Sequence, residues 1–219
     1  MTSSNLCLIC QTGLQALSLP GNDRTYHSCP NCQWIVLDKA WVPSLEKQKE
    51  RYLQHENSPE NSGYIEMFER FITTCVDPFI SRGKRILDYG CGPEPVLAGL
   101  LKKWAYVVDT YDLFFNPDEA FKTKKYNLII LTEVLEHLEN PLDLLQALSE
   151  KLEHQGVISI MTLFHPNDPE KFSKWWYRRD ITHISFYTIQ TLKEIAKVLD
   201  MSLIFSDSER MAVMCLRGK

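Results

Sequence analysis

The sequence lacks the features by which several large classes of protein are recognised. No apolar run approaches the roughly 20 residues that a membrane-spanning helix requires. The first residues, Met-Thr-Ser-Ser-Asn, contain neither a basic nor an apolar segment and so do not resemble a secretory signal. A formal net charge of −4 gives no general attraction to DNA or to anionic membranes. We therefore expect a cytoplasmic protein without DNA or membrane partners.

Two common phosphate-binding patterns are also missing. The segment Arg85-Ile-Leu-Asp-Tyr-Gly-Cys-Gly-Pro-Glu94 has the pattern of a buried strand, a glycine turn and the start of a helix. No Gly-Lys-Ser/Thr follows it, which excludes a phosphate loop. A dinucleotide fingerprint would need a third glycine where the chain has Pro95, and Glu94 would repel a pyrophosphate there. The acidic turn instead suits a cofactor with a cationic end and no phosphate, bound outside the carboxyl end of the strand.

The seven cysteines divide into two close pairs and three single residues. Cys7-x-x-Cys10 and Cys29-x-x-Cys32 have the spacing of a zinc ribbon, in which four thiolates surround one zinc ion. Four protein ligands leave no open position, so the zinc would be structural. The alternatives are four unrelated reduced thiols or a redox C-x-x-C, for which no thioredoxin-like βαβ unit is visible. We predict a small four-cysteine zinc ribbon over residues 1–40.

The rest of the chain alternates strand and helix patterns, as a doubly wound α/β sheet does. Strands are predicted at Trp34–Leu37, Arg85–Asp88, Ala105–Asp112, Tyr126–Leu131, Gly156–Met161, Met201–Ser206 and Met211–Leu216. Helices are predicted at Leu45–Leu53, Tyr64–Ile80, Val96–Lys103, Leu142–Leu152 and Leu192–Leu199. The last two strands have no helix between them and predict a terminal antiparallel hairpin. Because His55–Gly63 is punctuated like a loop, we expect a linker or lid over residues 41–63 and the main domain over residues 64–219.

Acidic residues stand where the predicted strands end. Asp88 ends the first strand of the main domain and Asp112 the second. An acid at the tip of the second strand commonly accepts hydrogen bonds from ribose hydroxyls in Rossmann-like folds. The alternative is that Asp112 only caps the following turn.

With these residues the chain resembles class I S-adenosylmethionine-dependent methyltransferases. Asp88-Tyr-Gly-Cys-Gly-Pro is similar to their first motif, Asp112 to the second, and the stretch Tyr126-Asn-Leu-Ile-Ile-Leu-Thr-Glu-Val-Leu-Glu-His137 to the fourth. The segments Met161–Pro166 and Trp175–Tyr187 and the element His55–Tyr64 resemble a bacterial subgroup of uncertain substrate.

This resemblance implies a Rossmann-like fold, S-adenosylmethionine as methyl donor and S-adenosylhomocysteine as product. The cofactor-binding residues that it implies are Asp88, Gly90, Cys91, Gly92, Asp112, Leu113, Thr132 and Glu133. The chain departs from the family between Asp112 and Tyr126, a stretch with no clear third strand ending in the acid that usually meets the adenine amine. Asp118 and Glu119 are the candidate replacements.

Methyl transfer from a sulfonium is an in-line displacement, so the enzyme mainly positions donor and acceptor. A general base is needed only for an acceptor that is protonated at neutral pH. The candidates near the expected mouth of the sheet are His165, His183, Glu133 and His137. His165 and His183, each taken alone, more often have a structural or substrate-shaping role than a catalytic one.

A sharper hypothesis groups four of these polar residues around a divalent cation that polarises an acceptor hydroxyl. Glu133, Glu136 and His137 share one short turn, and with His183 they resemble the metal site of small-RNA 3′-terminal 2′-O-methyltransferases. The simpler interpretation is that this E-x-x-E-H occurs without metal, with Glu133 near the donor and His137 in packing.

The acceptor is the least constrained part of the prediction. Lys171–Arg179 mixes cations with aromatics, as base-stacking surfaces do, but the same pattern fits an amphipathic lid packed on the sheet edge. A compact chain without net positive charge favours a small-molecule acceptor. The alternatives are an RNA or protein acceptor recognised through the ribbon, and a non-catalytic module that only binds S-adenosylmethionine.

Overall fold

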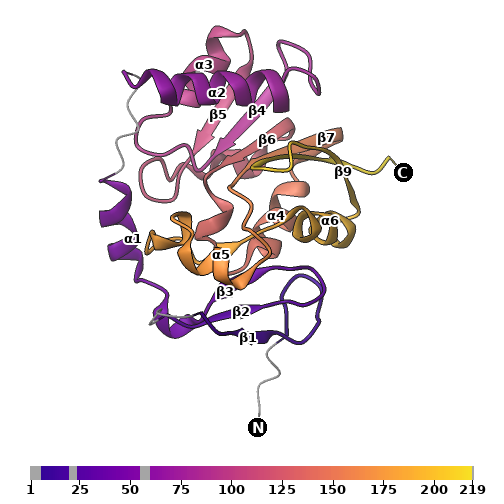
Figure 1. Ribbon diagram of the computed structural model, residues 1–219. Coiled ribbons are helices and arrows are strands. Elements are labelled where there is room, and N and C mark those ends of the chain that lie inside the picture. Colours follow the sequence, from indigo (N-terminus) through magenta and orange to yellow (C-terminus); the bar gives the residue numbers. More distant parts are fainter. Residues whose placement is uncertain (1–5, 20–23, 55–59, 219) are drawn as a thin grey trace.

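The computed structural model describes residues 6–19, 24–54 and 60–218. It contains two β-sheets, with the larger in the upper half of Figure 1 and the smaller at the bottom. The segment Met1–Asn5 and most of the predicted loop His55–Gly63 lie outside the described residues. Within the described ranges, none of the helices combines the length and the apolar character needed to cross a membrane.

The larger sheet has six strands in the order β5-β4-β6-β7-β10-β9. The first four are mutually parallel, and β10 is antiparallel to both β7 and β9. Its strands are β4 Arg85–Tyr89, β5 Val107–Tyr111, β6 Tyr126–Thr132, β7 Leu152–Met161, β9 Met201–Ser206 and β10 Met211–Leu216. The described stretch between β5 and β6 forms only the 3-10 helix η2 (Glu119–Thr123), as its short length indicated. The predicted α/β sheet with a terminal antiparallel hairpin is confirmed.

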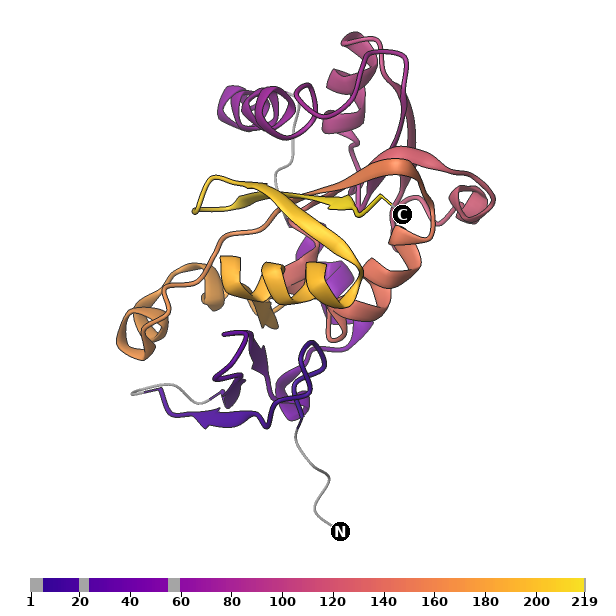
Figure 2. The ribbon, with the colours of Figure 1, turned by 90° about the vertical axis from the view of Figure 1, so that its right-hand side faces the viewer.

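Helices cover both faces of this sheet because successive strand side chains point to opposite faces. On one face α2 (Ser62–Cys75) and α3 (Val96–Lys103) pack with Ile86 and Leu128 in one apolar core. On the other face α4 (Pro141–Ser149) and α6 (Ile189–Val198) share a second core with Leu87 and Ile129. Figure 2 shows α2 above and α6 below the yellow hairpin of β9 and β10.

The smaller sheet joins the N-terminal module to the main domain. Its order is β1-β2-β3-β8, with strands β1 Gln15–Leu17, β2 Tyr26–Ser28, β3 Ile35–Leu37 and β8 Ser185–Phe186. β3 pairs antiparallel with β8, so a strand from the far end of the chain completes the N-terminal sheet. The remaining helices are η1 Lys39–Trp41, α1 Leu45–Tyr52, η3 Leu135–His137, α5 Pro169–Lys174 and η4 Tyr177–Arg179. In Figure 1, α1 and α5 lie between the two sheets.

Two predicted helix ends are wrong. The helix expected to reach Leu152 ends at Ser149, and Leu152 already pairs with Tyr126 at the start of β7. The Tyr126 N–H donates to the carbonyl of Lys151 at 2.8 Å, which sets the strand register four residues before the predicted start. The helix expected to reach Ile80 ends at Cys75, because Pro78 cannot continue a helix and disfavours helical backbone in the residue before it.

Candidate active site

The glycine turn after β4 lies against the end of β5. The N–H groups of Gly90 and Cys91 both donate to the carbonyl of Tyr111, at 2.7 and 3.1 Å. Gly90 and Gly92 have φ angles of +82° and +69°, in the left-handed region that residues with a Cβ disfavour. A Cβ on Gly90 would overlap Cγ2 of Val134 in the turn after β6. The turn therefore requires glycine for conformation and, at Gly90, also for space.

Asp112 braces this turn from the end of β5. Its Oδ2 accepts from the Gly92 N–H at 3.0 Å, and its Oδ1 accepts from the N–H groups of Phe114 and Phe115 at 2.8 and 3.1 Å. The carboxylate thus caps the following turn, as the alternative interpretation proposed, and also fixes the glycine loop. Oδ1 already accepts two hydrogen bonds, but Oδ2 accepts only one and keeps a second lone pair for a hydroxyl ligand.

Asp88 is a buried carboxyl group at the end of β4. It is 1 % exposed, and among the described residues neither oxygen has a hydrogen-bond partner. Burial, reinforced by the negative charge of Asp112, raises the pKa of Asp88 to about 7. A cationic ligand beside this carboxyl group would favour its ionised form.

The turn after β6 brings two glutamates onto one tyrosine. Glu133 is held with φ at +53°, and its N–H donates to the carbonyl of Met161 at 2.8 Å. The hydroxyl of Tyr177 lies 2.8 Å from Oε2 of Glu133 and also contacts Oε1 of Glu136. Burial raises the pKa of Glu133 to about 8, with a further contribution from Glu136, and burial also raises the pKa of Glu136.

Two histidines stand beside this carboxylate pair. His137 belongs to the same turn, and His183 comes from the segment before β8. Their ring centroids are 4.9 Å apart, and the Tyr177 ring lies 4.1 Å from that of His183. Nδ1 of His137 is 3.0 Å from the carbonyl of Thr182, and Nδ1 of His183 is 2.7 Å from the carbonyl of Tyr177.

The glycine turn, the two aspartates, Glu133, Tyr177 and the two histidines line one cavity of 890 Å³ at the carboxyl ends of the parallel strands, whereas the buried Glu136 does not. A volume of this size is in the range of small-molecule and cofactor sites. The structure places every predicted cofactor-binding residue on its wall: Asp88, Gly90, Cys91, Gly92, Asp112, Leu113, Thr132 and Glu133. The candidate catalytic residues His137 and His183 line the same cavity.

His165 does not belong to this site, which corrects its prediction as a catalytic residue. It is 4 % exposed, its Nε2 lies 2.8 Å from the carbonyl of Gln33, and its ring packs edge-on against Phe172. Burial lowers the pKa of His165. The prediction placed it after the last parallel strand, but the chain there turns toward the N-terminal module and away from the cavity. Asp118 and Glu119 are also absent from the cavity wall, and Asp118 caps η2 through the Ala120 N–H.

The cavity has a wall that the sequence did not reveal. Helix α1 contributes Arg51 and Tyr52, and Arg51 is joined to Asp180 by an ion pair of 2.8 Å. The Tyr52 ring lies 5.0 Å from that of His137 and 5.6 Å from that of Phe114. Helix α1, which lies within the stretch predicted as a linker or lid, thus forms part of the cavity wall. Its polar helical pattern gave no indication of which face would meet the cavity.

The four paired cysteines gather in one cluster. Sγ of Cys7 is 3.5 Å from that of Cys32, and Sγ of Cys10 is 3.4 Å from that of Cys29. Zinc–sulfur bonds of about 2.3 Å in a tetrahedron imply sulfur separations of about 3.8 Å, so the cluster fits zinc with small adjustments. Both C-x-x-C pairs form the same turn. The Gln11 N–H donates to the carbonyl of Cys7, and the Gln33 N–H donates to the carbonyl of Cys29, each at 2.9 Å.

The segment of mixed cations and aromatics is packed only in part, because Lys171, Lys174 and Arg179 are exposed. Phe172, Tyr177 and Arg178 are buried, and Arg178 donates to the carbonyls of Phe172 and Ser173. Trp176 remains 62 % exposed at the cavity mouth. The arrangement favours the packed lid over an extended base-stacking surface.

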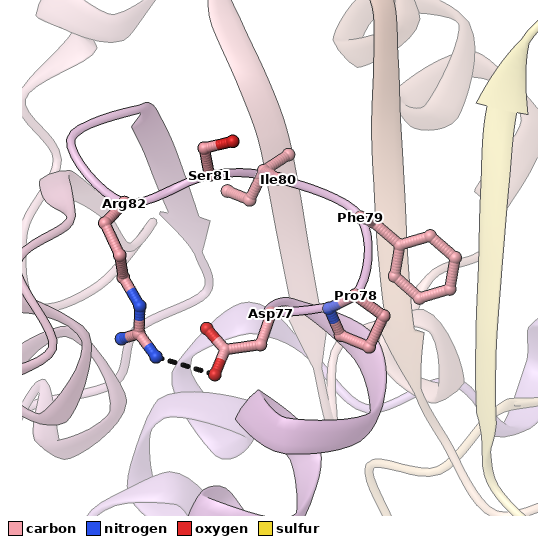
Figure 3. A pocket seen from close by; sticks show the side chains of 6 residues that line it. All are labelled: Asp77, Pro78, Phe79, Ile80, Ser81 and Arg82. Carbon is pink, nitrogen blue, oxygen red and sulfur yellow. Dashed lines mark hydrogen bonds and ion pairs between the residues drawn. The ribbon is translucent and has the colours of Figure 1, made fainter.

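A second hollow, of 420 Å³, is formed by the loop after α2 (Figure 3). Figure 3 shows the guanidinium of Arg82 turned toward the carboxylate of Asp77, with which it forms an ion pair of 2.7 Å. Arg82 also donates to the carbonyl of Trp104 at 2.7 Å and lies over the Trp104 ring. These contacts tie the loop to the turn before β5, which is a structural role.

Residues 57–203 match the family model of a methyltransferase domain. No curated protein sequence gives a significant match. Among solved structures, the chain is similar to magnesium protoporphyrin IX methyltransferase from Synechocystis PCC 6803, determined with bound S-adenosylmethionine. The TM-score is 0.52 and the sequence identity 13%, and the match covers 82% of this chain and 95% of that one. An O-methyltransferase family protein from Burkholderia thailandensis gives a TM-score of 0.55 and 10% identity over 78% of this chain and 63% of that one.

The mitomycin 7-O-methyltransferase gives a TM-score of 0.52 and 10% identity, covering 76% of this chain and 60% of that one. The chain therefore spans less than two thirds of each of these two O-methyltransferases. At such identities the structural likeness establishes the fold alone.

Proposed function

The chain belongs to the methyltransferase domain family, and we propose that it transfers the methyl group of S-adenosylmethionine to a small-molecule acceptor in the 890 Å³ cavity. One observation carries the proposal. Eight residues chosen from sequence motifs as cofactor contacts, spread over positions 88 to 133, line a single cavity at the carboxyl ends of β4, β5 and β6. Open α/β sheets bind their ligands at this edge.

The donor fits the acidic side of the cavity. Gly90 and Gly92 give the methionine end close access to the backbone, and Asp88 supplies a negative charge for its cationic groups. Asp112 is the acceptor for the ribose hydroxyls, and Thr132 and Glu133 flank the sulfonium. In the reaction the acceptor atom forms a bond to the methyl carbon while the carbon–sulfur bond breaks. The electron pair of the broken bond stays on sulfur, so the product S-adenosylhomocysteine has no positive charge on its sulfur atom.

The acceptor occupies the other side of the cavity, between α1 and the segment before β8. This wall presents rings from Tyr52, Phe114 and Trp176 and the imidazoles of His137 and His183. Flat apolar walls with a few polar groups are typical of small-molecule sites. The Arg51–Asp180 ion pair ties α1 to this segment, which restricts access by a folded protein or a duplex.

We also propose that the four-cysteine cluster holds a structural zinc ion. The close sulfur separations and the repeated turn support this assignment. Four thiolates complete the coordination of zinc, so this ion takes no part in the transfer.

Calorimetry with S-adenosylmethionine and S-adenosylhomocysteine tests the donor assignment. Replacing Asp112 with alanine is expected to weaken binding of both by about 30-fold or more, because the residue holds Gly92 and supplies the ribose acceptor. Asp109→Asn is the matched control, since Asp109 sits on the same strand but pairs with Arg85 and Lys124 outside the cavity. Absence of binding by the unmodified protein would refute the proposal. Binding without turnover across small-molecule, RNA and protein acceptors would identify a cofactor-binding module.

The raised pKa of Asp88 predicts two opposite pH trends between about pH 4 and 7. The protonated Asp88 carboxyl group stabilises the ligand-free fold relative to the ionised one. This stabilisation is fully present below the ordinary pKa of an aspartate and is lost as pH rises through about 7. The melting temperature should therefore fall as pH rises. Affinity for the cationic donor should rise several-fold over the same interval, because the carboxylate ionises. Asp88→Asn should reduce both trends, and the remaining fall in melting temperature is expected from Glu133, whose pKa is also raised. Melting curves at three pH values, with and without S-adenosylmethionine, measure both. A donor affinity that is independent of pH would contradict the role given to Asp88.

A further inference from the structure

Glu136, His137 and His183 form a compact group at the acceptor side of the cavity. Each offers one ligand atom, and these three atoms all lie within 4.8 Å of one another. Ligands around a divalent cation with bonds near 2.1 Å are separated by about 3 to 4.2 Å, so the three atoms lie near one another at the scale of a metal site and would draw together around an ion. His137 and His183 line the cavity, which gives an ion and an oxygen ligand access to the group.

Backbone contacts fix which nitrogen of each ring faces the group. A carbonyl can only accept, so Nδ1 of His137 carries the proton that it donates to Thr182, and Nδ1 of His183 the one that it donates to Tyr177. Each neutral imidazole then has its lone pair on Nε2. Metal-ligating histidines almost always have this arrangement, in which the other ring nitrogen donates to a carbonyl or carboxylate.

Glu136 completes the group as a buried carboxylate with an unsatisfied oxygen. Its side chain is fully buried, Oε1 is held by the Tyr177 hydroxyl, and among the described residues Oε2 has no hydrogen-bond partner. An orphaned carboxylate oxygen in the interior is costly unless a cation or donor meets it. The same Tyr177 hydroxyl holds Glu133, so this tyrosine sets the geometry of both carboxylates.

We propose that Glu136, His137 and His183 bind one divalent transition-metal ion whose open positions take an oxygen of the acceptor. Two imidazoles and one carboxylate suit Mn²⁺, Fe²⁺ or Zn²⁺ better than Mg²⁺ or Ca²⁺, which favour all-oxygen sites. Glu133, included in the group expected from the sequence, stands outside this triad.

The catalytic role of this ion rests on the proposed methyltransferase function and names its acceptor class as a hydroxyl compound. A metal-bound hydroxyl has a lowered pKa and releases its proton to solvent. The resulting oxyanion attacks the methyl carbon, an oxygen–carbon bond forms, the carbon–sulfur bond breaks and the electron pair stays on sulfur. The cavity would then favour acceptors whose hydroxyl reaches the triad.

Titration of Mn²⁺ into protein that holds a single zinc ion per chain, the one expected at the four cysteines, tests the site when the free Mn²⁺ is followed by electron paramagnetic resonance. One Mn²⁺ is expected to bind each chain beyond the ribbon zinc, and to raise the melting temperature. Glu136→Gln and His183→Asn should each weaken Mn²⁺ binding by about 100-fold or more, because each removes a direct ligand. The chain provides a matched control pair in Glu153→Gln and His154→Asn, a second Glu-His dipeptide whose side chains are exposed on β7.

The Glu136→Gln variant also separates ligand loss from misfolding. Glutamine keeps the contact with Tyr177 and removes a buried charge, so without Mn²⁺ this variant should melt at or above the temperature of the parent. No Mn²⁺ binding by the parent, or equal binding by the two triad variants, would overturn the proposal. Calorimetry with S-adenosylmethionine on the same samples keeps the two hypotheses apart. Donor binding without Mn²⁺ binding defeats only the metal site, and Mn²⁺ binding without donor binding defeats only the methyltransferase assignment.

Discussion

Replacing Cys32 with serine is expected to abolish zinc binding and to reduce methyl transfer by about 100-fold or more, although Cys32 lies outside the cavity. A structural zinc site contributes its binding free energy, about 10–16 kcal/mol in isolated zinc-finger peptides, to the folding of the module that surrounds it. The four cysteine thiolates are the centre of that module. Loss of one ligand would therefore unfold the knuckles and not merely weaken them.

The effect reaches the cavity through buried hydrogen bonds. Trp34, two residues after Cys32, donates from Nε1 to Ser185 at 2.8 Å, and Ser185 donates to the Tyr187 hydroxyl at 2.8 Å. Tyr187 in turn donates to the carbonyl of Leu135, inside the turn that carries the glutamates, at 2.7 Å. β3 also pairs with β8, directly after His183. Unfolding the ribbon thus removes supports of both walls that hold His137 and His183.

Metal analysis, activity and melting curves on one preparation measure this outcome. The variant should lose its zinc and lower the melting temperature by roughly 10 °C or more, since each kcal/mol is worth about 2–4 °C in a chain of this size. Cys215→Ser is the matched control, because Cys215 lies on β10 and is not part of the four-cysteine cluster. Full activity in a zinc-free Cys32→Ser protein would show that the ribbon is dispensable for the site.

Sequence reasoning selected residues that line one cavity, as predicted cofactor contacts, because these residues follow strands. Asp88, Asp112 and Thr132 each occur where an apolar run stops, and parallel strands bring their carboxyl ends to one edge of the sheet. The strand order then juxtaposes them without further information. The spacing of the paired cysteines similarly predicted their clustering, because four sulfurs in two tight turns have few compact arrangements.

The acceptor side depends on contacts between residues far apart in the chain. Tyr177 meets Glu133 and Glu136 only because η4 packs across the turn after β6, and no local pattern encodes that contact. The docking of β3 on β8 was equally hidden, since a two-residue strand carries no periodicity. His165 was misplaced for the same reason. Its partner, the carbonyl of Gln33, is 132 positions away.

Gly90→Ala is expected to be the most damaging single substitution in the donor half of the cavity. An alanine there must adopt a φ near +82°, which costs about 1–2 kcal/mol, and its Cβ overlaps Cγ2 of Val134. Relieving such an overlap by backbone shifts costs about 1–3 kcal/mol more. The shift would also break the Gly90 hydrogen bond to Tyr111 that holds the turn against β5. The melting temperature should fall by about 5–15 °C, and donor affinity by about 100-fold.

Two further variants divide this effect into its parts. Gly83→Ala imposes a similar φ of +79° where a Cβ would meet nothing within 4 Å, so it measures the backbone strain alone and should leave donor affinity unchanged. Val134→Ala combined with Gly90→Ala removes the overlapping methyl groups, and the double variant should recover part of both losses. Thermal melts and calorimetry on the parent, Gly90→Ala, Val134→Ala alone and the double variant give the coupling energy between positions 90 and 134. A coupling energy of zero would mean that the glycine turn after β4 can shift toward β5 without an energetic cost. In that case the closeness of the glycine loop to the turn after β6 would not explain why glycine is needed at position 90.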